Sequence, residues 1–230
     1  MSKKKKILLG IAIVFFGLLI SYQFVGYKGY LKVYNIPTTS SSPTLEPGDY
    51  IIVSNLVPAQ RNDFIIFKRL DENFGLANYV SRMIAKQGDT LSIKNGTAYV
   101  NGINIDKDIR LKHSYIINDN QLKSIQHILL SDYDNYYRIG ENKIMIHLED
   151  SVVKKFIPEA TLTYTTTTKE NQNNVHESFS KDWNSYNFGP LIISGNKFFV
   201  MGDNRDNTLD SRFIGLIDQN NYVGNAINVH

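Results

Sequence analysis

Residues 197–216 read KFFVMGDNRDNTLDSRFIGL, and this stretch constrains the fold more than any other segment of the chain. Its first five residues are mostly apolar and predict a β-strand. A dense group of charges follows, and charges beside a strand need partners: Asp203, Arg205, Asp206, Asp210 and Arg212. The spacing alone favours a surface turn with solvated ion pairs, each worth about 0–1 kcal/mol. The alternative is a network that orders the backbone beside an active site, with Thr208 and Asp210 as hydrogen-bonding supports.

The segments upstream of this stretch are typical of short strands. Runs of β-branched and aromatic residues at 50–53 and 64–67 are bounded by Gly, Pro, Asn and Asp. Apolar and polar side chains alternate around Asn95-Gly96, which predicts a hairpin, and Asn101-Gly102 predicts a second tight turn. The sequon that begins at Asn95 fits this turn better than a glycosylation site. The sequence therefore predicts a mainly β fold built from coiled antiparallel sheet.

Residues 105–185 differ in composition from the segments on either side of them. They are rich in Asn, Tyr, Asp and Lys and contain few glycines. The sequence predicts a short helix at 121–130 and strands at 143–150 and 160–168. It also predicts a polar mobile loop at 165–182. We expect this region to be a β-rich subdomain that is inserted into a β core.

The N-terminus combines a basic tail with a long apolar run. Lys3 to Lys6 precede an uncharged segment from Ile7 to Tyr27, and about 20 such residues form a helix that spans a bilayer. The lysines would remain in the cytoplasm. A cleaved signal peptide is the less favoured alternative, because the apolar run is long and no A-x-A-like site follows it. The expected organisation is a tail, a transmembrane anchor, a first core segment, the insert and a second core segment: residues 1–6, 7–27, 28–104, 105–185 and 186–230.

Composition excludes several classes of function. The net charge is +3 and much of the excess lies in the lysine tail, so the sequence carries no nucleic-acid footprint. The chain has no cysteine, which excludes disulfides and thiolate chemistry. No metal or other cofactor is expected, because the sequence has neither a ligand cluster with metal-binding spacing nor a glycine-rich phosphate loop.

Residues 36–50, IPTTSSSPTLEPGDY, raise the question of a nucleophile, because three consecutive serines precede a proline. A serine hydroxyl needs a neighbouring group to accept its proton. Together with residues 62–70, 79–102 and 188–215, this segment resembles the signature boxes of the type I signal peptidases, the membrane-anchored serine endopeptidases of bacteria. The boxes occur in the order found in that family and cover roughly half of the chain. The resemblance implies a signal-peptidase-like catalytic core.

The resemblance also implies roles for individual residues. Pro43-Thr44 sets the register and makes Ser40 the nucleophile. Thr38 falls where a hydroxyl helps the backbone amide of the nucleophile to bind the oxyanion. Thr208 and Asp210 fall on positions that orient the base. The structural ion network of the family is matched by Arg82, Asp203, Arg205 and Arg212.

Two departures from the family pattern lie at the active site. The family's general base is a desolvated lysine directly before an arginine. Arg82 is present here, but Ser81 precedes it, and a serine is too weak a base to activate Ser40 unaided. Ser41 falls where the family usually has methionine. The other lysines and histidines considered as bases show no pattern that favours this role: Lys68, Lys86, His113, His127, His147 and His176.

Two functions are consistent with this pattern. The first, slightly favoured because the signature set is otherwise readable, is an active signal peptidase that takes its base from elsewhere. The second is a catalytically silent relative that binds signal peptides along a strand edge and regulates an active peptidase. A self-cleaving regulator is a weaker third, because the chain shows no DNA-binding module. The resemblance implies secretory precursors, the bilayer and the translocon as partners, in the bacterial inner membrane with the N-terminus cytoplasmic and the catalytic domain outside.

Overall fold

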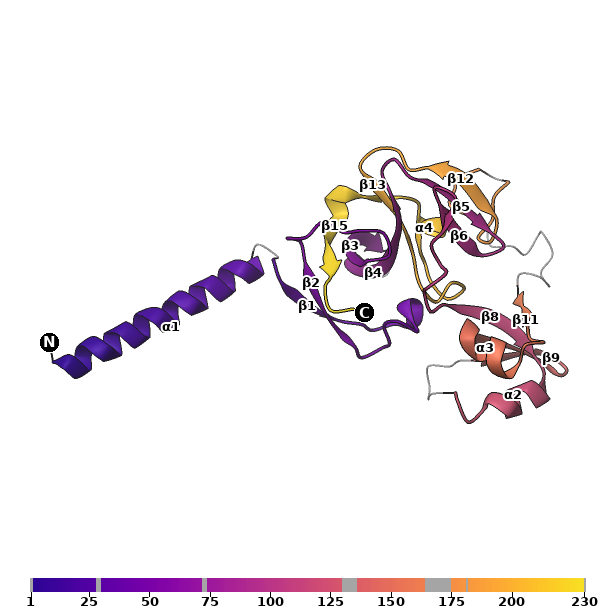
Figure 1. The fold of residues 1–230 in the computed structure, drawn as a ribbon, viewed down its shortest axis with the longest axis horizontal. Helices are drawn as coiled ribbons and strands as arrows, with labels where there is room; N and C mark the ends of the chain where they lie inside the picture. Colours follow the sequence, from indigo (N-terminus) through magenta and orange to yellow (C-terminus); the bar gives the residue numbers. More distant parts are fainter. Residues whose placement is uncertain are drawn as a thin grey trace.

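The computed structural model describes residues 2–27, 30–71, 74–129, 136–163, 175–180 and 182–229. Helix α1 (Lys3–Tyr27) projects away from a body that is built mainly of antiparallel strands (Figure 1). The expected helix is therefore present, but it begins at Lys3 and includes the lysines that were predicted as a separate tail. The expected membrane span is not found, because no helix among the described residues is both long enough and apolar enough to cross a membrane.

The largest sheet has seven strands and combines the two ends of the chain. Its strand order is β1-β2-β15-β3-β4-β13-β14, and each pairing is antiparallel. The core that this sheet covers is apolar, with Phe64, Phe67 and Phe199 at 2% exposure or less. The strands are β1 (Lys32–Asn35), β2 (Tyr50–Ser54), β3 (Phe64–Asp71), β4 (Gly75–Lys86), β13 (Lys197–Met201), β14 (Ile217–Asp218) and β15 (Tyr222–Ala226).

A second sheet confirms the two predicted turns. Its order is β12-β5-β6-β7, formed by Phe188–Ile192, Thr90–Lys94, Thr97–Val100 and Ile103–Asn104. Asn95 and Gly96 connect β5 to β6 with positive φ angles of 50° and 82°, as a tight hairpin turn requires. Asn101-Gly102 connects β6 to β7 in the same way, with φ angles of 52° and 81°.

The third sheet lies within the region predicted as an insert. Its order is β11-β8-β10-β9, and a separate cluster of buried apolar residues lies beneath it. The expected helix begins at Asp119 and ends at Ile125. The strand expected at 160–168 is described only in part: Thr161–Leu162 form a short strand, and residues 164–168 lie outside the described ranges. Most of the loop expected at 165–182 also lies outside them. The elements are β8 (Lys112–Ile117), α2 (Asp119–Ile125), β9 (Tyr136–Gly140), β10 (Lys143–Glu149), α3 (Asp150–Phe156) and β11 (Thr161–Leu162).

The described residues also contain three short helical segments: η1 (Thr39–Ser41), α4 (Ser211–Ile214) and η5 (Gln219–Asn221). Asp210 caps α4, because its side chain accepts a hydrogen bond from the backbone N–H of Arg212. Segment η1 packs against β4, so the three-serine segment lies on the seven-stranded sheet.

The turn between β4 and β5 is held by Asp89, which is 4% exposed. Its carboxylate accepts hydrogen bonds from Arg61 Nη2 at 2.5 Å, from Asn101 Nδ2 at 3.0 Å and from the backbone N–H of Lys86 at 3.0 Å. The hydrogen bond from Arg61 is the main reason that the pKa of Asp89 falls from 3.8 to about 2.

The substitution Asp89→Asn should therefore have a pH-dependent effect on stability. A carboxylate with a depressed pKa stabilises the fold above its ordinary pKa, and this contribution is lost as the pH falls toward about 2. Because Arg61 is partly exposed, we expect a loss of about 1–2 kcal/mol in the free energy of unfolding at pH 7, narrowing at pH 3. Urea denaturation at both pH values measures it. An equal loss at both would show that the charge contributes nothing.

Candidate active site

The charges that follow β13 form buried ion pairs, so the interpretation as a solvated surface turn is wrong. Arg205 and Arg212 are each 1% exposed. Burial is the largest single influence and lowers the pKa of Arg212, but the nearby acidic groups, chiefly Asp210, together outweigh it and the pKa is raised. Removing one partner of such a pair leaves a buried charge at a cost of about 3–5 kcal/mol. The pairs are Arg82–Asp203 at 2.5 Å, Arg205–Asp106 at 2.5 Å and Arg212–Asp210 at 2.8 Å.

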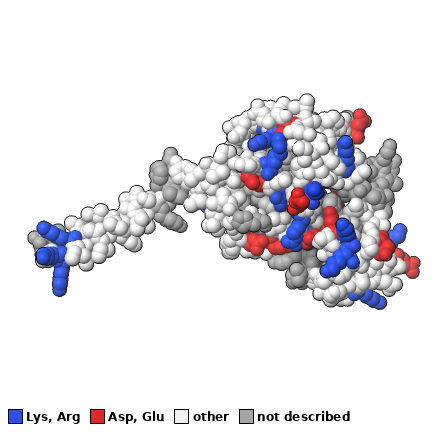
Figure 2. Space-filling model, viewed as in Figure 1, with Lys and Arg blue, Asp and Glu red and all other residues white. Residues whose placement is uncertain are grey.

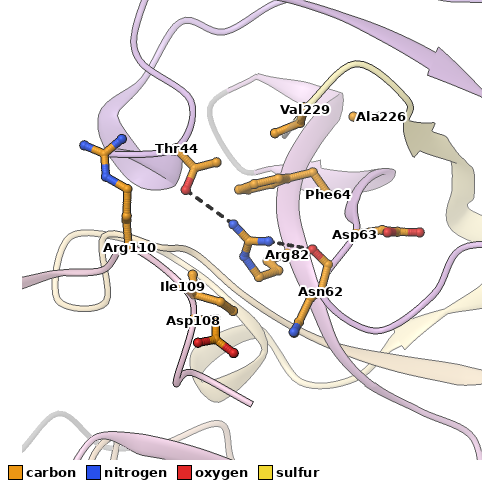
Figure 3. A pocket seen from close by; sticks show the side chains of 10 residues that line it. All are labelled: Thr44, Asn62, Asp63, Phe64, Arg82, Asp108, Ile109, Arg110, Ala226 and Val229. Carbon is orange, nitrogen blue, oxygen red and sulfur yellow. Dashed lines mark hydrogen bonds between the residues drawn. The ribbon is translucent and has the colours of Figure 1, made fainter.

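Arg82 lines a cavity of about 240 Å³ together with Thr44, which follows η1, and Phe64 of β3 (Figure 3). Its guanidinium lies over the ring of Phe64 at 4.3 Å, and Nη1 donates to the carbonyl oxygen of Asn62 at 2.6 Å. Nη2 donates to Thr44 Oγ1 at 3.3 Å, and that hydroxyl donates in turn to Asp203 at 2.5 Å. Arg82 thus ties the segment after η1 to β3 and to the loop after β13.

Ser40 lies in η1 and is half-buried. Its Oγ is 3.1 Å from Thr38 Oγ1, which is hydrogen-bonding distance. The turn is closed by the backbone N–H of Ser42, which donates to the carbonyl of Thr39 at 3.0 Å. The two hydroxyls of the predicted nucleophile and oxyanion support therefore lie side by side.

Gly202 brings several of the candidate residues together. An ideal Cβ at this position would overlap the carbonyl oxygen of Ser40 and the hydroxyl of Thr208, and would lie 2.7 Å from Thr208 Cβ. The backbone N–H of Gly202 donates to Asp210 Oδ2 at 3.2 Å. Residues from η1, from the loop after β13 and from the cap of α4 thus meet at Gly202, and only glycine fits there.

Ser81, which the resemblance predicts to stand at the position of the base, lies on β4 opposite Ile65. It is 4% exposed, and its Oγ donates to the carbonyl oxygen of Val80 at 2.8 Å. The next pair along the sheet is Arg82 with Met201, so position 81 lies close to the Gly202 junction. Among the residues that the structure describes, no lysine, histidine or carboxylate is within hydrogen-bonding distance of Ser40 Oγ.

None of the alternative bases considered from the sequence contacts Ser40 Oγ among the described residues. Lys86 and Lys68 have exposed side chains on β4 and β3. Burial lowers the pKa of His147, so this imidazole is neutral at pH 7, but its Nδ1 lies 2.8 Å from Ser114 Oγ. Of the other histidines considered, His113 contacts Asp150, His176 contacts Ser178 and His127 contacts Phe156.

Ser41 and Ser42 are both fully buried and provide a matched pair for a stability measurement. Within the described ranges of the chain, Ser41 Oγ has no hydrogen-bond partner, whereas Ser42 Oγ donates to Glu46 at 2.5 Å. We expect Ser41→Ala to leave the free energy of unfolding unchanged or raise it by about 1 kcal/mol, and Ser42→Ala to lower it by about 1–3 kcal/mol. Chemical denaturation decides, and equal effects would contradict this assignment.

Several contacts of the site were not identified from the sequence. Asp106 pairs with Arg205 across 99 positions, and no local pattern could have linked them. The carboxylate of Asp206 accepts hydrogen bonds from Tyr186 at 2.6 Å and from the backbone N–H of Ser114 at 2.8 Å, both in the region predicted as an insert or at its end. Gly202 was visible only as the residue between a strand and a charged loop, which is a weak signal.

Comparison with known proteins gives one family. A family model described as "Signal peptidase, peptidase S26" matches residues 7–230. A signal peptidase I from Buchnera aphidicola subsp. Baizongia pistaciae is 27% identical over 218 residues, which cover 84% of this chain and 67% of that protein. A signal peptidase I from Aquifex aeolicus is 28% identical over 209 residues, covering 86% and 75%.

A crystal structure of a signal peptidase I from Enterococcus faecalis V583 covers 75% of this chain and 100% of its own, at 21% identity and a TM-score of 0.35. The assignment rests on the family model, because that match extends over nearly the whole sequence. This chain therefore belongs to the signal peptidase family, peptidase S26.

Proposed function

We propose that the protein is a signal peptidase I, an endopeptidase that removes signal peptides from secreted precursors with Ser40 as the nucleophile. The family match over residues 7–230 carries this proposal. The geometry at Ser40 is consistent with it, because a half-buried hydroxyl lies beside a second hydroxyl, Thr38, and next to a glycine that allows close approach.

The reaction follows from these groups. Ser40 Oγ attacks the carbonyl carbon of the scissile peptide bond and gives up its proton. The oxyanion of the tetrahedral intermediate is stabilised by the backbone N–H of Ser40 and the hydroxyl of Thr38, which donate to it. Collapse breaks the C–N bond, the amine leaves with a proton, and water then hydrolyses the ester on Ser40.

The step that the site supports least is removal of the proton from Ser40. Ser81 stands at the position of the base and donates its own hydrogen to Val80. We propose that the proton passes to solvent or to a group that the bound precursor supplies, which makes this step slow. A serine peptidase without its base retains about 10³–10⁴-fold catalysis over water from its oxyanion hole and binding alone.

We further propose that α1 holds the protein at the bacterial inner membrane, with the lysine tail in the cytoplasm and the strands outside. Large apolar side chains of α1 are exposed between Ile7 and Ile20, by 43% at Leu19 to 73% at Leu8. Figure 2 shows basic side chains at the free end of this helix and none on its visible apolar length. Apolar surface of this extent favours transfer from water into lipid. Precursors would then reach Ser40 as they leave the secretion translocon.

Cleavage of a secretory precursor in reconstituted membranes tests the proposal, with Ser40→Ala as the control. We expect wild type to cleave slowly at one site and the control to be inactive. Cleavage that survives in the control would reject Ser40 as the nucleophile. No cleavage by wild type, with retained binding of the signal peptide, would favour the catalytically silent relative.

A further inference from the structure

Asn204 contacts the nucleophile segment in two ways, although no sequence motif assigns it a role. It is 2% exposed and lies two residues after Gly202. Its backbone N–H donates to the carbonyl of Ser40 at 3.2 Å, and its side-chain Nδ2 donates to the carbonyl of Thr39 at 3.1 Å. One buried residue thus holds two successive carbonyls of η1, including that of the nucleophile.

The amide nitrogen of Asn204 makes the hydrogen bond between this side chain and η1. Asn204 Oδ1 is buried and has no hydrogen-bond partner among the described residues, so Nδ2 makes the side chain's polar interaction. Asn207 in the same loop offers a comparison, because its Nδ2 also reaches Thr39, at Oγ1 and 3.2 Å. Asn207, however, is exposed, and water can replace that bond.

Strand β8 holds Asn204 from the other side. The backbone N–H of Lys112 donates to the carbonyl of Asp203 at 3.0 Å, and the N–H of Arg205 donates to the carbonyl of Lys112 at 2.9 Å. These bonds form a parallel bridge between Lys112 and Asn204. Because neighbouring residues of an extended segment direct their backbone groups to opposite edges, Asn204 faces η1 while its neighbours face β8.

We propose that Asn204 is a positioning residue for Ser40, and that β8 of the region at 105–185 supports the active site by fixing Asn204. A misplacement of about 1 Å at a reacting group can cost about 10²-fold in rate. The catalytic aspect of this inference rests on the proposed function, whereas the ordering of η1 by Asn204 does not depend on it.

The variant N204D keeps the shape of the side chain but replaces the donor with an acceptor. We expect kcat to fall about 10–100-fold at pH 8, with KM changed less than about threefold. Lowering the pH should restore some of the lost kcat relative to wild type, because a protonated carboxyl group can donate to Thr39 again. The matched variant N207D changes the same group at an exposed position and should retain kcat within about twofold. A kcat that stays low at the lower pH, in N204D that urea denaturation shows to be folded at both pH values, would contradict the donor role.

Hydrogen–deuterium exchange separates this proposal from the proposed function. The amides of Ser42 and Leu45 donate within the nucleophile segment, to Thr39 and Ser41, and should exchange faster in N204D than in N207D. Unchanged exchange, or faster exchange with unchanged kcat, would overturn the positioning role. If wild type cleaves nothing, faster exchange still supports the ordering of η1 and the proposed function alone is rejected. Asn204→Ala, which buries no charge, takes the place of N204D if that variant does not fold.

Discussion

Precursor cleavage should accelerate by about 10²–10⁴-fold when Ser81 is replaced by lysine, which is the range that a positioned general base supplies. Position 81 lies on β4 at 4% exposure, beside the Gly202 junction where Ser40 and Thr208 meet. A lysine amine in such a buried place is disfavoured as a cation, so a fraction of it is neutral and can accept the proton of Ser40. Initial rates with a reconstituted precursor measure the change.

The pH dependence and two controls make this result specific. In Ser81→Lys, kcat/KM should rise with pH through the pKa of the new amine, as a base that acts in its neutral form requires. Ser81→Met has a long side chain without a base and should show no acceleration. Combining Ser81→Lys with Ser40→Ala should abolish activity. A gain in the methionine variant as well would attribute the effect to packing and not to proton transfer.

The second large effect is expected for Gly202→Ala, which should reduce kcat by at least about 10²-fold. The added methyl group would overlap the carbonyl oxygen of Ser40 and the side chain of Thr208, so the nucleophile segment or the α4 cap must move. We also expect a loss of about 1–3 kcal/mol in the free energy of unfolding, as for other overpacked sites. Rates and denaturation midpoints of the same preparation provide both values.

Gly140→Ala is the matched control for this substitution. Its added Cβ would lie 3.8 Å from Lys143, an ordinary contact distance, and Gly140 belongs to the exposed strand β9 of a different sheet from Ser40's neighbours. We expect little change in rate or stability there. If Gly202→Ala behaves like Gly140→Ala, then the close approach at Ser40 has no functional consequence.

Much of the local structure was determined by the sequence, because it depends on short-range rules. The two Asn-Gly turns and the strands beside them follow from turn chemistry and alternation, and both turns are present. The N-terminal helix follows from a long apolar run, although no helix in the described ranges is long and apolar enough to span a membrane. The family motifs placed Ser40, Thr38, Thr208 and Asp210 as candidates, and the structure brings their segments together.

The tertiary structure alone decided whether the charges after β13 are solvated or buried. The spacing favoured solvation, but Arg205 pairs with Asp106, which lies far away in the sequence, and burial makes the loss of either partner costly. It also decided the contacts of Asn204, since two carbonyls of η1 and strand β8 converge on this residue only after folding. The resemblance predicts that Ser81 stands where the family has its lysine. Whether another residue lies close enough to replace it depends on distances between side chains, and these are set by packing rather than by local sequence.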